Sequence, residues 1–312
     1  MAGNRLRCAA VAGMLMLTAG CGALTQGVGP AATPPPLPSG ITPAPSVSPS
    51  QSAARAKPAV PVAASVLRNA PNVPGPWHLV FSDDFDGSRL NDDNWVTCYD
   101  WNDDGCTNAG HRELEWYLPG QVSVDNGALV LSAAKQPTYG SDQKTHSWTS
   151  GMVSTGRNSW YGSTHYTITY GYIAAAIQIP AEHGMFPAFW LMPAAAKTTP
   201  PEIDIFEGTS NPETAQMTLH WLTSAGKDVH SANQYGPVDY PAGYHVFAVD
   251  WEPTSITWYI DGVEHYRVTD NSRIPRVAME ILLDLAVGWP KSPPADITSA
   301  QMKVDWVRAW QH

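Results

Sequence analysis

Three acidic residues stand close together in the segment 201–208, whose sequence is PEIDIFEG. Glu202 and Asp204 share one face of a regular strand, whereas Glu207 points to the opposite face. A β-bulge between Asp204 and Glu207 would turn Glu207 to the face of the other two, and bulges often redirect side chains at active sites. The Cα atoms of the two glutamates would then lie roughly 13 Å apart. Their side chains would bring the carboxyl groups to about 5–5.5 Å, the separation of a retaining glycosidase pair.

Carboxylates crowded on one face repel one another, which raises at least one pKa and can leave a protonated acid beside an ionised nucleophile. Asp204 lies too close to either glutamate to leave room for a sugar, so it suits a supporting role. A calcium site and a solvated acidic strand are the alternatives. Calcium would account for three acids but not for the apolar Ile203, Ile205 and Phe206 among them, and an exposed strand would not need all three.

The sequence around these acids predicts short strands. From Trp77 onward, apolar or alternating runs are interrupted by Gly, Pro, Asn and Asp, with no convincing amphipathic helix longer than two turns. The alternating run 257–260 leads through Asp261-Gly262 into 263–268, which predicts a hairpin. Many short strands in succession predict a single all-β domain over 77–312, either a sandwich or a barrel.

Charge and aromatic content restrict the partners of this domain. Residues 77–312 carry 13 basic and 28 acidic side chains, a net charge of −15, whereas residues 1–76 hold five basic residues and no acid. Because binding of phosphate or sulfate needs clustered Lys and Arg, this balance argues against nucleic acids and other polyanions. The 13 Trp and 12 Tyr of the chain suit a flat, neutral ligand as well as core packing.

The N-terminal segment predicts export. Arg5 and Arg7 precede an apolar run at 8–17 that is too short to span a bilayer as a helix. Small residues then lead to Cys21, in a pattern that resembles a bacterial lipoprotein processing site. We therefore predict a signal segment over 1–21, lipidation of Cys21 and a cell-surface lipoprotein. Ordinary signal peptidase cleavage, which would give a secreted protein, is the alternative.

Residues 22–76 connect this segment to the predicted domain. They hold 13 of the 28 prolines of the chain, mixed with Ala, Ser, Thr and Val, and no aromatic residue precedes Trp77. This composition predicts a mostly disordered spacer. Its role would be to hold the domain away from a membrane surface.

Two cysteines remain once Cys8 and Cys21 are assigned to the leader. Cys98 and Cys106 lie eight residues apart, and in an exported chain such a pair predicts a disulfide. Two free thiols are the alternative. A metal site is not expected there, because only two sulfur atoms are present and no paired histidine spacing lies nearby.

Several motifs of the chain occur together in one known family. The EIDIFE sequence at 202–207 is similar to an E-x-D-x-x-E signature, and similar segments run through nearly all of 77–312: Phe81–Phe85 with Trp95, 113–117, 171–193, 244–262 and 302–311. Together they resemble glycoside hydrolase family 16 in its bulged, laminarinase-like form. The resemblance implies a concanavalin-like jelly roll, a β-sandwich whose concave sheet holds the substrate in a cleft.

The resemblance also implies a role for each acid. Glu202 would be the nucleophile, Glu207 the general acid and base, and Asp204 the residue that orients and tunes the pair. Protonated Glu207 would donate to the glycosidic oxygen while Glu202 attacks the anomeric carbon, and Glu207 would then activate water to release the glycosyl-enzyme. A sugar hydroxyl in place of water would give transglycosylation. This chemistry requires no cofactor.

Five substrate contacts follow from the same resemblance. Trp190 matches a sugar-platform tryptophan, with core packing as the alternative, and His220 matches a cleft histidine, with a structural role as the alternative. Phe186 stands where the family commonly has a second tryptophan. Glu113 belongs to the 113–117 motif, and Trp289 lies in a loop that is shorter than the laminarinase form.

Family members frequently bind a structural calcium on the opposite face. Asp305 matches the acid of the closing strand, Gly127 would supply a backbone carbonyl, and Asp84 replaces the usual glutamate. An internal salt bridge of Asp305 is the competing account.

We therefore predict an exported, monomeric endo-β-glucanase that cleaves β-1,3 or mixed β-1,3/1,4 glucan with retention. Its partner would be a neutral β-glucan, with membrane contact only through the lipid anchor. Family members that cleave sulfated or agar-type galactans need cationic subsites, of which a domain with a charge of −15 offers few. A non-catalytic carbohydrate-binding protein of the same fold is one alternative, although both outer carboxylates are present. A cell-wall glucan transglycosylase is the other.

Overall fold

The computed structural model describes residues 67–69, 71–99, 106, 113–157, 162–195 and 199–312. The predicted leader 1–21, Cys21 and most of the spacer 22–76 lie outside the described residues. In the part of the chain that the structure describes, no helix has the length and apolar character needed to cross a membrane.

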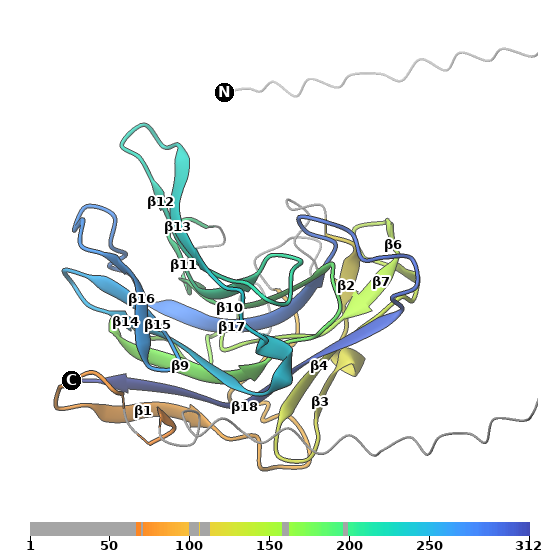
Figure 1. Cartoon of the computed structure of the whole chain (residues 1–312), viewed down its shortest axis with the longest axis horizontal. Helices are drawn as coiled ribbons and strands as arrows, with labels where there is room; N and C mark the ends of the chain where they lie inside the picture. Colours follow the sequence, from red (N-terminus) through yellow and green to blue (C-terminus); the bar gives the residue numbers. More distant parts are fainter. Residues whose placement is uncertain (1–66, 70, 100–105, 107–112, 158–161, 196–198) are drawn as a thin grey trace, which may run out of the picture. The chain divides into compact units, whose positions relative to one another are not determined.

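Two stacked sheets make up the described fold, which confirms the predicted all-β sandwich (Figure 1). Among the described residues, the larger sheet has ten strands. Eight follow the order β16-β15-β14-β9-β18-β4-β7-β2, while β1 pairs with β18 and β3 with β4. Their bounds are His78–Asp83 (β1), Glu115–Tyr117 (β2), Val122–Val124 (β3), Leu129–Ala134 (β4), Trp148–Ser150 (β7), Gly171–Gln178 (β9), His245–Trp251 (β14), Ile256–Ile260 (β15), Val263–Val268 (β16) and Ser299–Gln311 (β18).

The smaller sheet has the strand order β13-β12-β11-β10-β17-β8 in the described chain. Its strands are Met152–Ser154 (β8), Met185–Pro193 (β10), Glu202–Gly208 (β11), Ala215–Leu222 (β12), Asp228–Tyr235 (β13) and Met279–Val287 (β17). A short hairpin, Thr138–Tyr139 (β5) and Thr145–His146 (β6), and two 3-10 turns, Pro119–Gln121 (η1) and Tyr240–Ala242 (η2), complete the described elements. The smaller sheet curves so that its outer face is concave, and β11 lies in its middle (Figure 1).

Alternation along the strands fills the space between the sheets with apolar side chains. Phe206 of β11 stacks on Phe247 of β14 with ring centroids 4.2 Å apart, and both side chains are fully buried. The predicted hairpin at 257–268 is confirmed as β15 and β16. Asp261 and Gly262 at its turn have φ angles of 50° and 78°, the positive values that a tight two-residue turn requires.

Packing of the domain begins earlier than the predicted boundary at Trp77. Leu67 is buried and belongs to the same apolar cluster as Tyr172 and Trp310, on the outer face of the larger sheet. The Trp77 indole donates to the carbonyl of Val73 at 2.8 Å, which fixes the end of the segment. Single apolar residues among prolines do not show the periodicity of a strand or helix, so composition alone placed these residues in the spacer.

Replacing Leu67 with Ala should therefore destabilise the domain. Loss of a buried leucine side chain costs about 2 kcal/mol or more in the free energy of unfolding. The matched control is Leu79→Ala, because Leu79 is 49% exposed and should cost less than about 0.5 kcal/mol. Thermal or denaturant unfolding measures both. Equal stabilities of the two variants would show that the segment before Trp77 does not pack against the sandwich.

Candidate active site

The strand β11 carries the three acids and contains the predicted bulge. Asp204 pairs with Thr218 of β12, but the next pair is Glu207 with Gln216. Two residues of β11 therefore lie opposite one residue of β12. The pairing of β11 with β10 shifts at the same place. The extra residue restores the facing of Glu207 to the side of Asp204.

The two residues inside the bulge both face the core. Ile205 and Phe206 are 1% and 0% exposed. On the other side of the strand, Glu202, Asp204 and Glu207 all line one cleft of about 330 Å³. The bulge thus separates an apolar pair from an acidic triad on one short strand.

All five predicted substrate contacts line the same cleft: Glu113, Phe186, Trp190, His220 and Trp289. Its described lining contains no lysine or arginine. Sequence reasoning missed eight further lining residues: Tyr99, Ala188, Thr199, Gln216, Thr218, Asp228, His230 and Asp284. Asp284 carried a usable signal, since a lone acid within the apolar run ILLDLAV is the same kind of exception as the acids of β11.

Two side chains of β12 hold Glu207. The Thr218 hydroxyl donates to Glu207 Oε2 at 2.6 Å, and the Gln216 amide donates to the same oxygen at 3.2 Å. Both residues pair with acids of β11 across the bulge, so the register places them there. Their hydrogen bonds orient the Glu207 carboxyl group in the cleft.

Glu202 and Asp204 form a strongly coupled pair. Burial, and then the charge of Asp204, raise the pKa of Glu202 well above its usual range, while the neighbouring His220 and a hydrogen bond with Thr199 lower it. Burial and the charge of Glu207 also raise the pKa of Asp204, while its hydrogen bond with Glu202 lowers it. His220 Nε2 lies 3.4 Å from Asp204 Oδ2. Because two carboxyl groups that share a hydrogen bond do not both ionise readily, the pair retains a proton.

Trp190 is fixed by an acid on the neighbouring strand β17. Its indole nitrogen donates to Asp284 Oδ1 at 2.7 Å, and the Tyr117 hydroxyl donates to Asp284 Oδ2 at 3.1 Å. Asp284 is 4% exposed, and burial is the main cause that raises its pKa to about 6. Trp190 itself is 7% exposed and pairs with Asp204 of β11, so its ring lies beside the acids. Packing and cleft lining therefore coexist in this residue.

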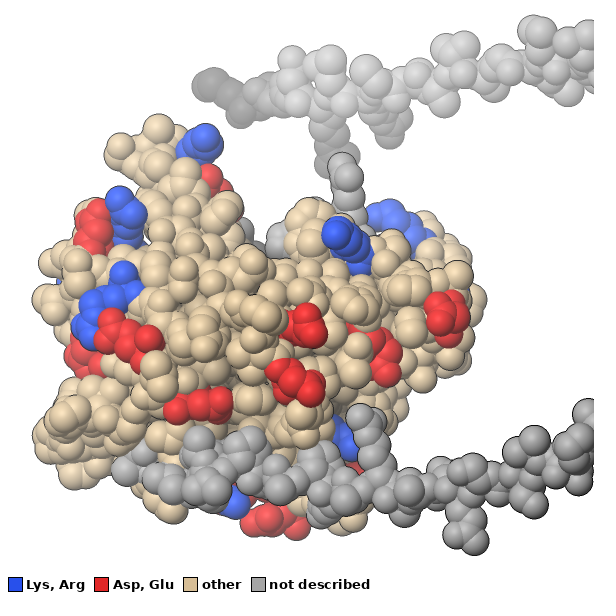
Figure 2. Space-filling view, in the orientation of Figure 1, with Lys and Arg blue, Asp and Glu red and all other residues tan. Residues whose placement is uncertain are grey.

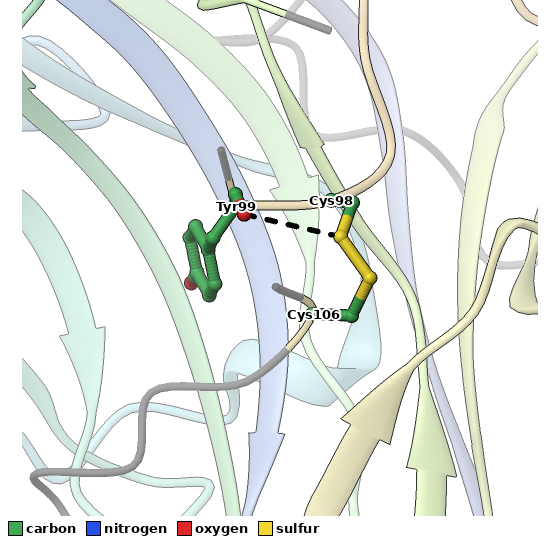
Figure 3. Close-up of a disulfide and its surroundings, with 3 residues drawn as sticks. All are labelled: Cys98, Tyr99 and Cys106. Atoms are coloured by element: carbon green, nitrogen blue, oxygen red, sulfur yellow. Dashed lines mark hydrogen bonds between the residues drawn. A yellow bond between two sulfur atoms is a disulfide. The ribbon is translucent and has the colours of Figure 1, made fainter. Parts of the chain in front are cut away.

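A disulfide joins Cys98 to Cys106 next to the cleft-lining residue Tyr99 (Figure 3). The Cα atoms of the two cysteines lie 4.7 Å apart, within the range of natural disulfides. Tyr99 follows the first cysteine directly and lines the cleft, and its ring meets that of Tyr117 edge to face at 5.4 Å. The carbonyl of Cys106 accepts a hydrogen bond from the Tyr117 amide at 2.7 Å. The bond therefore fixes one wall of the cleft.

A second acidic pair lies at this wall. Burial is the main cause that raises the pKa of Glu113 to about 8, with a further contribution from the charge of Asp284. Glu115 is fully buried, and its pKa is also raised. The Val287 amide donates to Glu115 Oε2 at 2.8 Å. Glu113 therefore presents a neutral carboxylic acid to the cleft at neutral pH.

Asp84, one of the residues predicted for calcium, forms ion pairs with two arginines. Arg308 Nη2 and Arg68 Nη2 lie 2.8 Å and 3.1 Å from Asp84 Oδ2, so two guanidinium groups neutralise this carboxylate. Within the described ranges, no group of three or more His, Cys, Asp or Glu side chains is arranged to hold a metal ion. Asp84 is therefore an ion-pair partner of two arginines, whereas a calcium site with Asp305 and Gly127 stays a prediction.

Acidic side chains grouped in an aromatic-walled cleft of a curved β-sandwich are the arrangement of a glycoside hydrolase. A family model described as "Glycosyl hydrolases family 16" matches residues 112–308, and the chain belongs to this family. The predicted jelly-roll class and the predicted family are both confirmed.

Characterised relatives match most of the described domain. The chain is 32% identical to the endo-1,3-1,4-β-glycanase EglC of Rhizobium meliloti (strain 1021) over 249 residues, which cover 74% of this chain and 51% of EglC. It is 28% identical to a β-glucanase of Rhodothermus marinus, covering 75% of this chain and 85% of that protein. The chain thus spans about half the length of EglC.

A solved structure has the same fold. The endo-β-1,3-glucanase from Pyrococcus furiosus superposes with a TM-score of 0.65 at 28% sequence identity. The match covers 75% of this chain and 94% of the other.

The half-buried Glu113 should make the free energy of unfolding fall as the pH rises. Its folded-state pKa of about 8 lies above the unfolded value, so between these two values the unfolded chain has released a proton that the folded protein retains. Glu113→Gln removes this effect. The variant should gain stability relative to the wild type by up to about 1.4 kcal/mol per pH unit as the pH rises through this window.

Denaturant unfolding at several pH values measures this difference. Glu213→Gln is the matched control, because Glu213 is exposed and should show no pH-dependent difference from the wild type. A difference between Glu113→Gln and the wild type that stays constant over the window would contradict a protonated Glu113.

Proposed function

We propose that this protein is a retaining endo-β-glucanase that hydrolyses β-1,3 or mixed β-1,3/1,4 linkages in a neutral glucan. The observation that carries the proposal is the bulge of β11, which places Glu202 and Glu207 in one cleft with Asp204 between them. The names of the relatives support a glucan as substrate: EglC is an endo-1,3-1,4-β-glycanase, and the Pyrococcus furiosus protein is an endo-β-1,3-glucanase.

In the first step, the proton of the Glu207 carboxyl group passes to the glycosidic oxygen. The bond between that oxygen and the anomeric carbon breaks, while a Glu202 carboxylate oxygen forms a bond to the same carbon. In the second step Glu207 removes a proton from water, whose oxygen displaces Glu202 from the anomeric carbon. The hydrogen bonds from Thr218 and Gln216 support this role, because they hold the Glu207 carboxyl group in one orientation through both steps.

The protonation of Glu202 and Asp204 determines whether Glu202 can act as the nucleophile. Glu202 must be ionised to attack, although burial raises its pKa. The hydrogen bond between the two carboxyl groups raises the pKa of Glu202 and lowers that of Asp204, so the resting pair holds its proton on Glu202. The attack requires that this proton first moves to Asp204, which leaves Glu202 ionised. The nearby His220 lowers the pKa of Glu202 and so favours its ionised form. Asp204 thus acts as the residue that takes up the proton of the nucleophile.

Charge supports a neutral substrate. The described lining of the cleft has acidic side chains and no lysine or arginine, so a sulfated chain would be repelled. On the visible face of the molecule, basic side chains are scattered among acidic ones and form no large basic patch (Figure 2). Both outer carboxylates line the cleft, which argues against a binding protein without turnover.

We also propose export of the protein, with a lipid anchor at Cys21 and a monomeric state. The support for export and the anchor is the sequence of residues 1–21 together with the Cys98–Cys106 bond, since disulfides persist mainly outside the reducing cytosol.

Replacement of each glutamate by Ala, followed by rescue with azide, tests the two roles separately. With an aryl β-glucoside of a laminari-oligosaccharide, both variants should lose roughly 10³-fold or more in activity, and azide should restore turnover. Azide takes the place of the missing carboxylate in Glu202→Ala and should give an α-glycosyl azide. In Glu207→Ala it attacks the glycosyl-enzyme and should give the β-anomer.

The control is Glu213→Ala at an exposed site, which should retain wild-type activity.

A panel of laminarin, mixed-linkage glucan, agarose and carrageenan should show sugar release from the first two only. Wild-type rates in Glu202→Ala, or release from carrageenan alone, would refute the proposal.

A further inference from the structure

The backbone of the bulge is tied to the opposite sheet. Trp258 lies on β15 of the larger sheet and is fully buried. Its indole nitrogen crosses the interior and donates to the backbone carbonyl of Asp204 at 2.9 Å. Asp204 is the residue at which the register of β11 shifts. The contact therefore falls at the place where an inserted residue disturbs the ladder of the catalytic strand.

We propose that Trp258 is a positioning residue for catalysis, which holds the bulge of β11 in the register that presents Glu207 to the cleft. The inference rests on the proposed glucanase function. Trp258 does not itself line the cleft, and its hydrogen bond reaches the backbone carbonyl of Asp204, which does.

The position of Trp258 is itself fixed by a second irregularity. The pairing of β15 with β16 shifts between Trp258 and Tyr259, so that Trp258 lies opposite Tyr266. The rings of Trp258 and Tyr266 pack with centroids 4.9 Å apart and an interplanar angle of 30°. The irregular part of β15 thus supplies the indole donor, and the bulge of β11 supplies the carbonyl that accepts its hydrogen bond across the interior.

The β15–β16 hairpin is also attached to the edge of the catalytic sheet. The Tyr266 hydroxyl is hydrogen-bonded to the Ser231 hydroxyl of β13, and the Asn233 amide donates to the carbonyl of His265 at 3.0 Å. β13 pairs with β12, which in turn carries the side chains that hold Glu207. In Figure 1 the hairpin lies at the same end of the sandwich as β12 and β13. The hairpin that carries the Trp258 indole is therefore fixed relative to β11 by two hydrogen bonds to β13.

A small displacement of the Asp204 backbone would change the relative positions of the two catalytic glutamates. Asp204 separates the two glutamates, and a misplacement of about 1 Å between reacting groups can reduce a rate by roughly 10²-fold. Weaker substrate contacts would instead raise KM, and a merely structural role would lower stability without selective loss of kcat.

The chain offers a matched control in Trp251 of the adjacent strand β14. This tryptophan is equally buried, and its indole donates to a backbone carbonyl, that of Pro275, at 3.2 Å. The acceptor lies far from β11 in the sequence and outside the cleft. Trp251→Phe and Trp258→Phe therefore remove the same chemical group from two comparable sites.

Steady-state kinetics of both variants on laminarin test the proposal. Trp258→Phe should lose about 10- to 100-fold in kcat with KM within about threefold of the wild type, while Trp251→Phe should keep kcat within about twofold. Equal effects on kcat in the two variants, or an unchanged kcat in Trp258→Phe, would overturn it.

Hydrogen exchange followed by mass spectrometry gives a readout that does not depend on activity. Peptides that contain 203–208 should exchange faster in Trp258→Phe than in Trp251→Phe. If the wild type fails to cleave any glucan, the proposed function fails, yet the exchange experiment still decides whether Trp258 holds the bulge. Unchanged exchange in this segment would overturn the inference.

A further variant serves if Trp258→Phe does not fold. Tyr266→Phe removes only the hydroxyl bonded to Ser231, and it should lower kcat by about threefold while the domain stays folded. Wild-type kcat and wild-type exchange of 203–208 in Tyr266→Phe would then contradict the proposed bracing of the catalytic strand.

Discussion

A strand presents its side chains alternately on two faces, and this period is the constraint on which the active site depends. Glu202 and Glu207 stand an odd number of residues apart, so a regular β11 would direct one of them into the core. The bulge resolves this conflict, and Ile205 and Phe206 then both enter the interior. A slip of one residue would bury a carboxylate beside Phe247, at a prohibitive desolvation cost. Burial thus stabilises the register that catalysis needs.

The crowding of acids supplies the protonation states that the reaction uses. Burial and mutual repulsion oppose the ionisation of Glu202 and Asp204 together, which keeps a proton in the pair. Asp284 and Glu113 are subject to the same effect on the other side of the cleft. Protonated Glu113 can bind a sugar hydroxyl there without adding to the negative potential of the cleft. The lack of basic groups in the described lining is therefore compatible with many acids at one site.

Local periodicity was sufficient to predict short strands and an all-β domain. The three acids predicted the bulge and the facing of Glu207, and the resemblance to the family predicted the sandwich. Local periodicity could not predict contacts between distant segments. Thr218 and Trp258 are ordinary strand residues in the sequence, and only the register of β12 and the stacking of the sheets bring them to β11. Leu67 packs against apolar side chains on the outer face of the larger sheet, and the composition of its own segment does not reveal that surface. The ion pairs of Asp84 could not be predicted either, because Arg308 lies far from it in the sequence and Arg68 lies in the assumed spacer.

The anomeric configuration of the first product tests the central claim most directly. If the bulge places Glu202 and Glu207 across one glycosidic bond at the distance of a retaining pair, the new reducing end must form as the β-anomer. Proton NMR during the first minutes of laminarin hydrolysis, before mutarotation, distinguishes the two anomers. The account predicts that β appears first and α follows only as the sugar equilibrates. Initial release of the α-anomer would show that the two carboxyl groups act across a wider gap, and it would contradict the account.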